Sequence, residues 1–387
     1  MIRDQQTLST PLFDPRIESL RGLAALAVVI THSCAVLRVD GSPAFWHIRF
    51  ADQSFAQQTL SLLSALFNSS AAVVLFFVLS GYVLTLSLNR QKAGGISVGA
   101  ISSYAIRRLF RLLPPMWASI AVMWIVLSAF RRPADNDVFS LWFTSVFATT
   151  LGPVDIFQNL ALVSFRTNPV TWTMYIEFIG SAFIPLSLVF CAYSGTRRSL
   201  WILVALAILT FVAYPKTPTG PPSQTSLTFI YLVCFQTGLA LTTFREKSIS
   251  PLLLCVVAIA IFVLERLVSP PNYLGTLMLT FASAALLTGV TKGQFERFLT
   301  STPLRFLGKI SYSLYLLHSP VLYVTGLIAV SIGIAGPGIA PTLFVFLVAI
   351  PLSILFAWIG YETIESWSIA AGRIASNQWI ARRARAI

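Results

Sequence analysis

The chain has 387 residues, of which 56% are hydrophobic and only 11% are charged. Soluble domains carry roughly 25% charged residues, so this composition excludes an ordinary water-soluble protein. Lys and Arg number 27 against 14 Asp and Glu. In a soluble chain that excess of basic residues would suggest binding to nucleic acid. Here the basic residues lie between long apolar runs, which indicates a membrane protein, so we predict no nucleic-acid partner. The four cysteines show no zinc-ligand spacing, so we predict no metal site.

Apolar runs long enough to cross a hydrocarbon core of ~30 Å recur along the chain. They predict an all-α, polytopic transmembrane helical bundle of about ten spans. Segment 140–163 is apolar in pieces but contains Gly152, Pro153 and Asp155, so we interpret it as a partly buried loop or interfacial helix. The expected spans are 20–38, 70–88, 113–130, 172–190, 199–214, 226–243, 251–268, 273–290, 310–331 and 341–364.

The distribution of basic residues predicts the topology. With the N-terminus inside, the cytoplasmic segments collect 20 of the 27 Lys and Arg, and the other side holds 7. The positive-inside rule therefore favours two cytoplasmic termini, in a multi-pass protein of the inner (cytoplasmic) membrane. We expect a cytoplasmic segment at 1–19, a transmembrane domain at 20–366 and a basic cytoplasmic tail at 367–387, which anchors the chain or lies along the membrane surface.

The first span carries Arg21 near its start and His32 further along. They are eleven positions apart, roughly 1100° of helical rotation, so both side chains share one face. Burial of such groups in a membrane is costly, which makes each a functional hypothesis. A neutral imidazole accepts and donates a proton near pH 7, as a general base for a hydroxyl requires. The alternative is that His32 bonds a neighbouring helix for packing alone.

Three arginines, Arg107, Arg108 and Arg111, lie within about one helical turn before the third span. Guanidinium groups pair bidentately with phosphate oxygens, so the cluster is a candidate site for a phosphate-bearing ligand. A positive-inside anchor is the alternative. Lys309, at the cytoplasmic edge of the ninth span, is a further candidate for the same ligand.

The fourth span opens with TWTMYIEFIG. Trp172 falls at the outer interface, where aromatic residues are enriched, and Glu177 lies about 8 Å deeper. A carboxylate at that depth should be paired or protonated. Glu177 could orient a histidine, bind a substrate hydroxyl or simply pair with an arginine.

The ninth span contains LGKISYSLYLLHSPVL at 307–322. Tyr312, Tyr315 and His318 follow at intervals of three, so they form one polar stripe, which should face the interior of the bundle. Pro320 removes a backbone hydrogen bond and frees a carbonyl group one turn earlier.

The second span contains FFVLSGYVL at 76–84. Ser80 and Gly81 are small enough to let two helices approach closely. The segment lacks the flanking glycines of a nucleophile elbow, so we assign Ser80 no nucleophilic role.

Taken together, these motifs resemble the acyltransferase 3 family of membrane-bound acyltransferases. The resemblance implies an acyl donor, usually acetyl-CoA or another acyl-CoA, used from the cytoplasmic side. It also implies a hydroxyl-bearing acceptor, commonly a surface or lipid-linked sugar, in contact with membrane lipids. The segments that carry it are, in chain order, LRGLAALAVVITH, FFVLSGYVL, RRLFRLLP, WTMYIE and LGKISYSLYLLHSPV.

The resemblance further implies that the Arg21–His32 pair is essential and that the arginine cluster lies near the coenzyme phosphates. Phe178 follows Glu177 where the family often has a second acid. A transporter or flippase with a proton relay is the alternative function. We therefore predict catalytic roles for His32, Arg21 and Glu177, cofactor binding by Arg107, Arg108, Arg111 and Lys309, and substrate binding by Trp172, Tyr312, Tyr315 and His318.

Overall fold

The structure is a computed structural model in which all regular elements of the described residues are helical. It describes residues 14–90, 97–130, 137–147, 150–191, 195–213, 224–243, 249–268, 273–334 and 336–385. The long helices are α1 (Pro15–Cys34), α3 (Ser69–Arg90), α4 (Val98–Ala129), α7 (Trp172–Cys191), α8 (Gly195–Ala213), α9 (Gln224–Leu241), α10 (Pro251–Val268), α11 (Tyr273–Thr291), α14 (Ser311–Ser331), α15 (Ala340–Gly360) and α16 (Ser366–Arg385).

These helices confirm the predicted fold class. A helix occupies each of the expected span positions, and eight helical segments of the described residues are long and apolar enough to cross a membrane. The number of spans and the cytoplasmic side of both termini remain predictions. Helix α1 begins five residues before the expected span, because Asp14 caps it by accepting a hydrogen bond from the backbone N–H of Arg16.

The connections contain short helices. They are α2 (Phe55–Leu66), α5 (Leu141–Val146), α6 (Pro153–Leu160), α12 (Glu296–Leu299) and α13 (Thr302–Lys309). At 1.5 Å per residue, α5 and α6 are each too short to cross a membrane, which agrees with the interpretation of segment 140–163 as a loop or interfacial helix in its described part.

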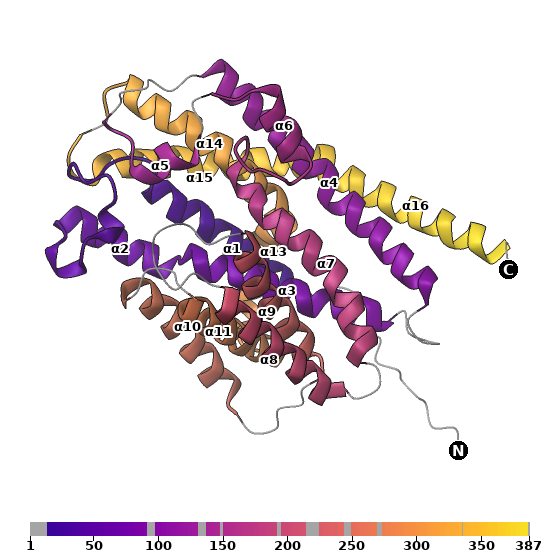
Figure 1. Ribbon diagram of the computed structural model, residues 1–387. Helices are drawn as coiled ribbons and strands as arrows, with labels where there is room; N and C mark the ends of the chain where they lie inside the picture. The colour runs from indigo at the N-terminus through magenta and orange to yellow at the C-terminus, as the bar shows by residue number, and fades with distance from the viewer. Residues whose placement is uncertain are drawn as a thin grey trace.

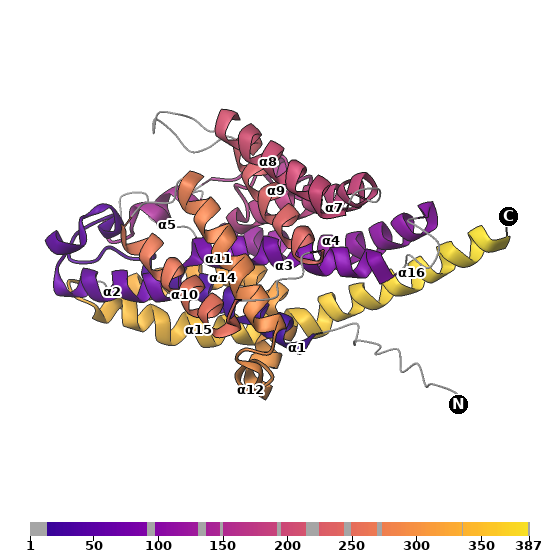
Figure 2. The same cartoon turned by 90° about the horizontal axis from the view of Figure 1, so that it is seen from below.

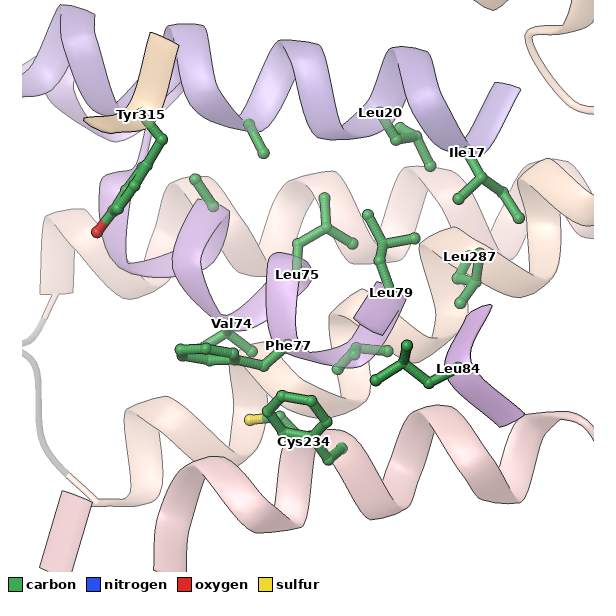
Figure 3. Close-up of a cluster of buried hydrophobic side chains, with 14 of the residues drawn as sticks. Ile17, Leu20, Val74, Leu75, Phe77, Leu79, Leu84, Cys234, Leu287 and Tyr315 are labelled. Atoms are coloured by element: carbon green, nitrogen blue, oxygen red, sulfur yellow. The ribbon is translucent and has the colours of Figure 1, made fainter. Parts of the chain in front are cut away.

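Helix α3 lies inside the bundle and packs against α1, α7, α9 and α11. Figure 3 shows Leu75 and Phe77 of α3 among side chains of the neighbouring helices. Helices α3 and α9 cross closely because glycines face the opposite backbone. A Cβ at Gly81 would lie 2.1 Å from the carbonyl oxygen of Phe235, and one at Gly238 would lie 2.1 Å from that of Val78. The predicted packing role of the Ser-Gly pair in α3 agrees with this crossing.

The basic tail is helical. Helix α15 continues through a π-helical turn (Tyr361–Glu365) into α16, which packs along α4. Figures 1 and 2 show α16 and the first half of α4 extending together away from the remaining helices. Residues 367–385 therefore form a helical extension, and its docking partner among the described residues is α4.

We predict that Gly81→Ala lowers the melting temperature of the detergent-solubilised protein. The new methyl group would collide with the backbone of α9, and overpacking of this kind costs about 1–3 kcal/mol. Gly99→Ala is the matched control in α4, because the nearest atom to its new Cβ is 3.7 Å away. Equal melting temperatures for the two variants would contradict the close crossing of α3 and α9.

Candidate active site

A pair of histidines lies between α1 and α14. His32 Nδ1 is 3.0 Å from His318 Nε2, and His318 Nδ1 is 2.7 Å from the backbone oxygen of Tyr315. His318 is fully buried, whereas His32 is half-buried. The indole of Trp142 lies against the imidazole of His32, with ring centroids 4.8 Å apart.

This geometry fixes the tautomers of both rings. The carbonyl of Tyr315 can only accept, so His318 Nδ1 carries the hydrogen and donates it. In neutral His318, Nε2 must then accept, so His32 Nδ1 donates. The Nε2 atom of His32 consequently retains its lone pair, which is the state that a general base needs.

A polar cluster that the sequence did not reveal lies beside Pro320 of α14. Pro320 has no N–H, so it frees the carbonyl of Leu316, four residues earlier. Asn168 Nδ2 donates to this oxygen at 3.2 Å and to Ser119 Oγ at 3.1 Å. Asn159 Oδ1 in turn accepts from the backbone N–H of Asn168 at 2.8 Å. The segment before α7 is thereby held against α14 and α4.

His32 lines a pocket of about 260 Å³, here called the outer pocket. Its walls include the aromatic side chains of Trp142, Trp172 and Tyr231. Trp172 and Tyr231 pack with their ring centroids 5.4 Å apart. The pocket also has three serines in its lining, Ser69, Ser70 and Ser319.

Arg21 lines a second, smaller hollow of about 40 Å³, here called the inner cavity. Glu177, Ser80 and Tyr312 also line it. Tyr312 donates its hydroxyl hydrogen to the backbone oxygen of Leu112 at 2.7 Å. Arg21 and His32, although on one face of α1, therefore line two separate hollows and not a single one.

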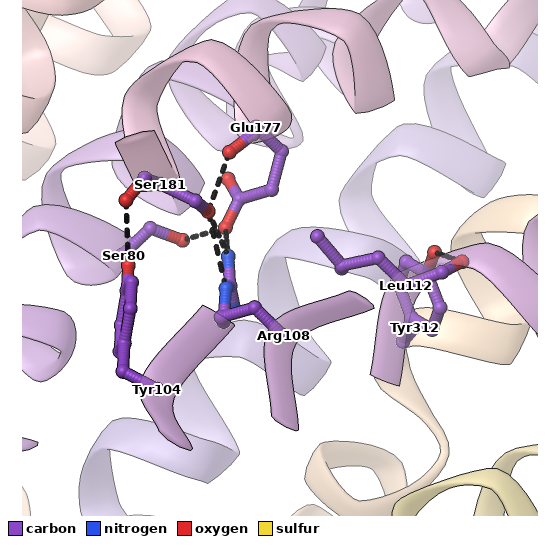
Figure 4. A network of polar contacts seen from close by, with 7 residues as sticks. All are labelled: Ser80, Tyr104, Arg108, Leu112, Glu177, Ser181 and Tyr312. Atoms are coloured by element: carbon purple, nitrogen blue, oxygen red, sulfur yellow. Dashed lines mark hydrogen bonds and ion pairs between the residues drawn. The ribbon is translucent and has the colours of Figure 1, made fainter. Parts of the chain in front are cut away.

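Figure 4 shows the polar network beside the inner cavity. Arg108 forms an ion pair with Glu177, and its Nη2 also donates to Ser181 Oγ at 2.9 Å. Ser80 donates to the same carboxylate at 2.9 Å. Tyr104 donates to the backbone oxygen of Ser181 at 2.9 Å. Glu177 is thus joined to Arg108 and not to His32; of the roles considered for it, pairing with an arginine is the one that the structure displays.

Arg21 and Arg111 have no hydrogen-bond or ion-pair partner among the described residues. Arg108, Arg111, Glu177 and Glu365 all lie within electrostatic range of Arg21. Glu177 pairs with Arg108, while Glu18 and Glu365 lie within electrostatic range of Arg21 and Arg111 without forming an ion pair with either. The N–H donors of Arg21 and Arg111 therefore have no partner in the described part of the chain.

The other two predicted cofactor-binding residues have partners of their own. Arg107 Nη1 donates to Ser103 Oγ at 2.7 Å and to Ser376 Oγ at 3.1 Å, which joins α4 to α16. Lys309 pairs with Glu362 at 2.9 Å and lies over the ring of Tyr361. Neither residue lines the inner cavity.

Of the predicted substrate-binding residues, only Trp172 and Tyr315 line the outer pocket. Tyr312 lies at the inner cavity, and His318 lies behind His32. Trp142 was missed because it belongs to α5, which is six residues long and too short to display a helical periodicity. An isolated Trp in a predicted outer loop was the only available signal.

The fold defines a polytopic helical membrane protein, with one hollow beside His32 and another beside Arg21. The acyltransferase domain of the acyltransferase 3 family matches residues 14–362. The chain belongs to that family and is an acyltransferase, as the motifs predicted. No solved structure matches it.

Curated relatives include O-acetyltransferase PaAT-1 of Phomopsis amygdali, which is 24% identical over 80% of this chain and 72% of its own length. The peptidoglycan O-acetyltransferase OatA of Listeria monocytogenes is 24% identical over 80% of this chain and 50% of its own. O-acetyltransferase OatA of Staphylococcus aureus is 23% identical over 93% and 58%. The chain thus spans little more than half of these bacterial relatives.

We predict that His318→Leu lowers kcat roughly 10²-fold while the KM for the acyl donor changes little. Leucine cannot accept from His32 Nδ1, so the base loses its fixed tautomer. His318→Gln is the matched variant, because its amide can accept from His32 and donate to the carbonyl of Tyr315, and it should restore much of the rate. A well-expressed His318→Leu protein with the original kcat would refute this role.

Proposed function

We propose that the protein is a membrane O-acetyltransferase of the cytoplasmic membrane. It takes an acyl group from acyl-CoA at the inner face and transfers it to a hydroxyl of a carbohydrate or lipid-linked glycan at the outer face. The observation that carries this proposal is the pair of adjoining hollows, with unpaired arginine at one and a histidine base at the other. The names of the relatives support O-acetylation.

The donor side rests on charge. Arg21 and Arg111 have no hydrogen-bond or ion-pair partner in the described part of the chain, and acyl-CoA carries phosphates that guanidinium groups bind well. The positive-inside distribution favours the cytoplasm for this end of α1, and CoA esters are made there. The narrow cavity beside Arg21 then receives the acyl end of the donor.

The acceptor side rests on the outer pocket. Trp142, Trp172 and Tyr231 offer broad apolar faces, and the serines of the pocket offer hydroxyl groups. Aromatic rings of this kind combine a large contact area with a polar edge, which suits the alternating apolar faces and hydroxyls of a sugar ring. Membrane lipids at the rim would present a lipid-linked acceptor at the same height.

His32 then acts as the base. Its Nε2 removes the proton of the acceptor hydroxyl while the hydroxyl oxygen attacks the thioester carbonyl. The new C–O bond forms, the C–S bond breaks, and the CoA thiolate leaves and takes up the proton from His32. During the step the imidazolium is stabilised through its Nδ1–H, which donates to neutral His318.

The test is transfer by the purified protein in proteoliposomes. With radiolabelled acetyl-CoA and a chitooligosaccharide acceptor, we expect a labelled ester that is lost under mild alkali. His32→Ala should lower the rate by roughly 10²- to 10⁴-fold, as for a lost general base. Near-normal acetylation by a well-expressed His32→Ala protein would sink the catalytic assignment. Uptake of the acceptor without ester formation would favour a transporter instead.

The donor site is tested separately through its arginines. We predict that Arg111→Gln raises the KM for acetyl-CoA roughly tenfold, since a hydrogen bond to a charged group contributes about 1.5–3 kcal/mol. Arg107→Gln is the matched control, because Arg107 already binds Ser103 and Ser376. Its effect should fall on stability and not on the KM. Equal KM changes in both variants would contradict the assignment.

A further inference from the structure

The inner cavity and the outer pocket share two lining residues, Val73 of α3 and Tyr315 of α14. The Tyr315 ring packs against two neighbouring rings. Its centroid is 6.0 Å from that of Phe76, in an edge-on arrangement, and 5.8 Å from that of His318. These two side chains therefore form one wall between the hollow with Arg21 and the hollow with His32.

The inner cavity is small on its side of this wall. Its volume is about 40 Å³, and a single water needs roughly 10–15 Å³. The cavity thus accommodates about three water-sized groups, which is the number of heavy atoms in an acetyl group. Val73, Phe76, Phe77 and Met174 make its lining largely apolar, as suits a methyl group.

We propose that Val73 and Tyr315 restrict the acyl group to the length of acetyl, an inference that rests on the proposed transfer from acyl-CoA. The donor enters from the arginine end, so the terminal methyl group of its acyl chain reaches the wall first. With acetyl, the reacting carbonyl is one bond behind that methyl, nearer to His32 than the carbonyl of any longer acyl group. Each added methylene holds the carbonyl further back from His32, because close-packed side chains do not yield to an extra carbon at no cost.

The test is the ratio of butyryl to acetyl transfer, measured with the two CoA esters in proteoliposomes. Val73→Ala removes two methyl groups from the wall and enlarges the inner cavity. We therefore expect the ratio of butyryl to acetyl transfer to rise roughly tenfold or more, the scale on which an apolar pocket discriminates one methylene. Val28→Ala is the matched control, since Val28 lines the outer pocket but not the inner cavity. Its ratio should stay at the wild-type value.

The outcomes separate the two proposals. Wild-type acetyl transfer with an unchanged ratio in Val73→Ala would overturn the role of the wall, as would an equal rise in Val28→Ala. If Val73→Ala does not fold, Tyr315→Leu replaces it, with Tyr315→Phe as the variant that should keep the wild-type ratio. A wild-type protein that transfers no acyl group from either ester would overturn the proposed function itself.

Discussion

The ion pair between Arg108 and Glu177 is the constraint on which the inner half of the molecule depends. It joins α4 to α7, and Ser80 adds α3 to the same carboxylate. Removing one partner of a buried pair leaves an uncompensated charge and costs about 3–5 kcal/mol, so the three helices are held in one arrangement. Glu177 pairs with Arg108, and neither Glu18 nor Glu365 forms an ion pair with Arg21 or Arg111, so these two guanidinium groups keep their N–H donors without a partner among the described residues.

A different principle holds the outer half together. There the groups are neutral, and directional hydrogen bonds take the place of an ion pair. The carbonyl of Tyr315 sets the tautomer of His318, which sets that of His32. Pro320 lies two residues after His318, and the Leu316 carbonyl that it frees accepts a hydrogen bond from Asn168. An unsatisfied carbonyl in an apolar interior is costly, so this hydrogen bond both satisfies α14 at its proline and holds the segment that leads to Trp172.

The residues that sequence reasoning placed well are those related by a single helix. Arg21 and His32 share a face because helical period alone decides it, and the long apolar runs fix the helices themselves. Partnerships between helices were not readable, because the rotation of one helix against another depends on packing. Thus Glu177 pairs with Arg108, and Arg107 binds Ser376. His318 contacts His32 and does not line the outer pocket. Trp142 escaped notice for a related reason, since α5 is too short to carry a period.

The spacing in α1 then acquires a geometric meaning. One residue more or fewer between Arg21 and His32 would alter their separation by only about 1.5 Å, a change that a flexible donor arm absorbs easily. It would, however, turn the imidazole by about 100°, away from His318 and out of the outer pocket. The spacing of eleven positions therefore fixes the direction in which the His32 imidazole points, more than its distance from Arg21. The arginine and the base must face the same side of α1, because α3 and α14 build the wall between the two hollows on that side alone.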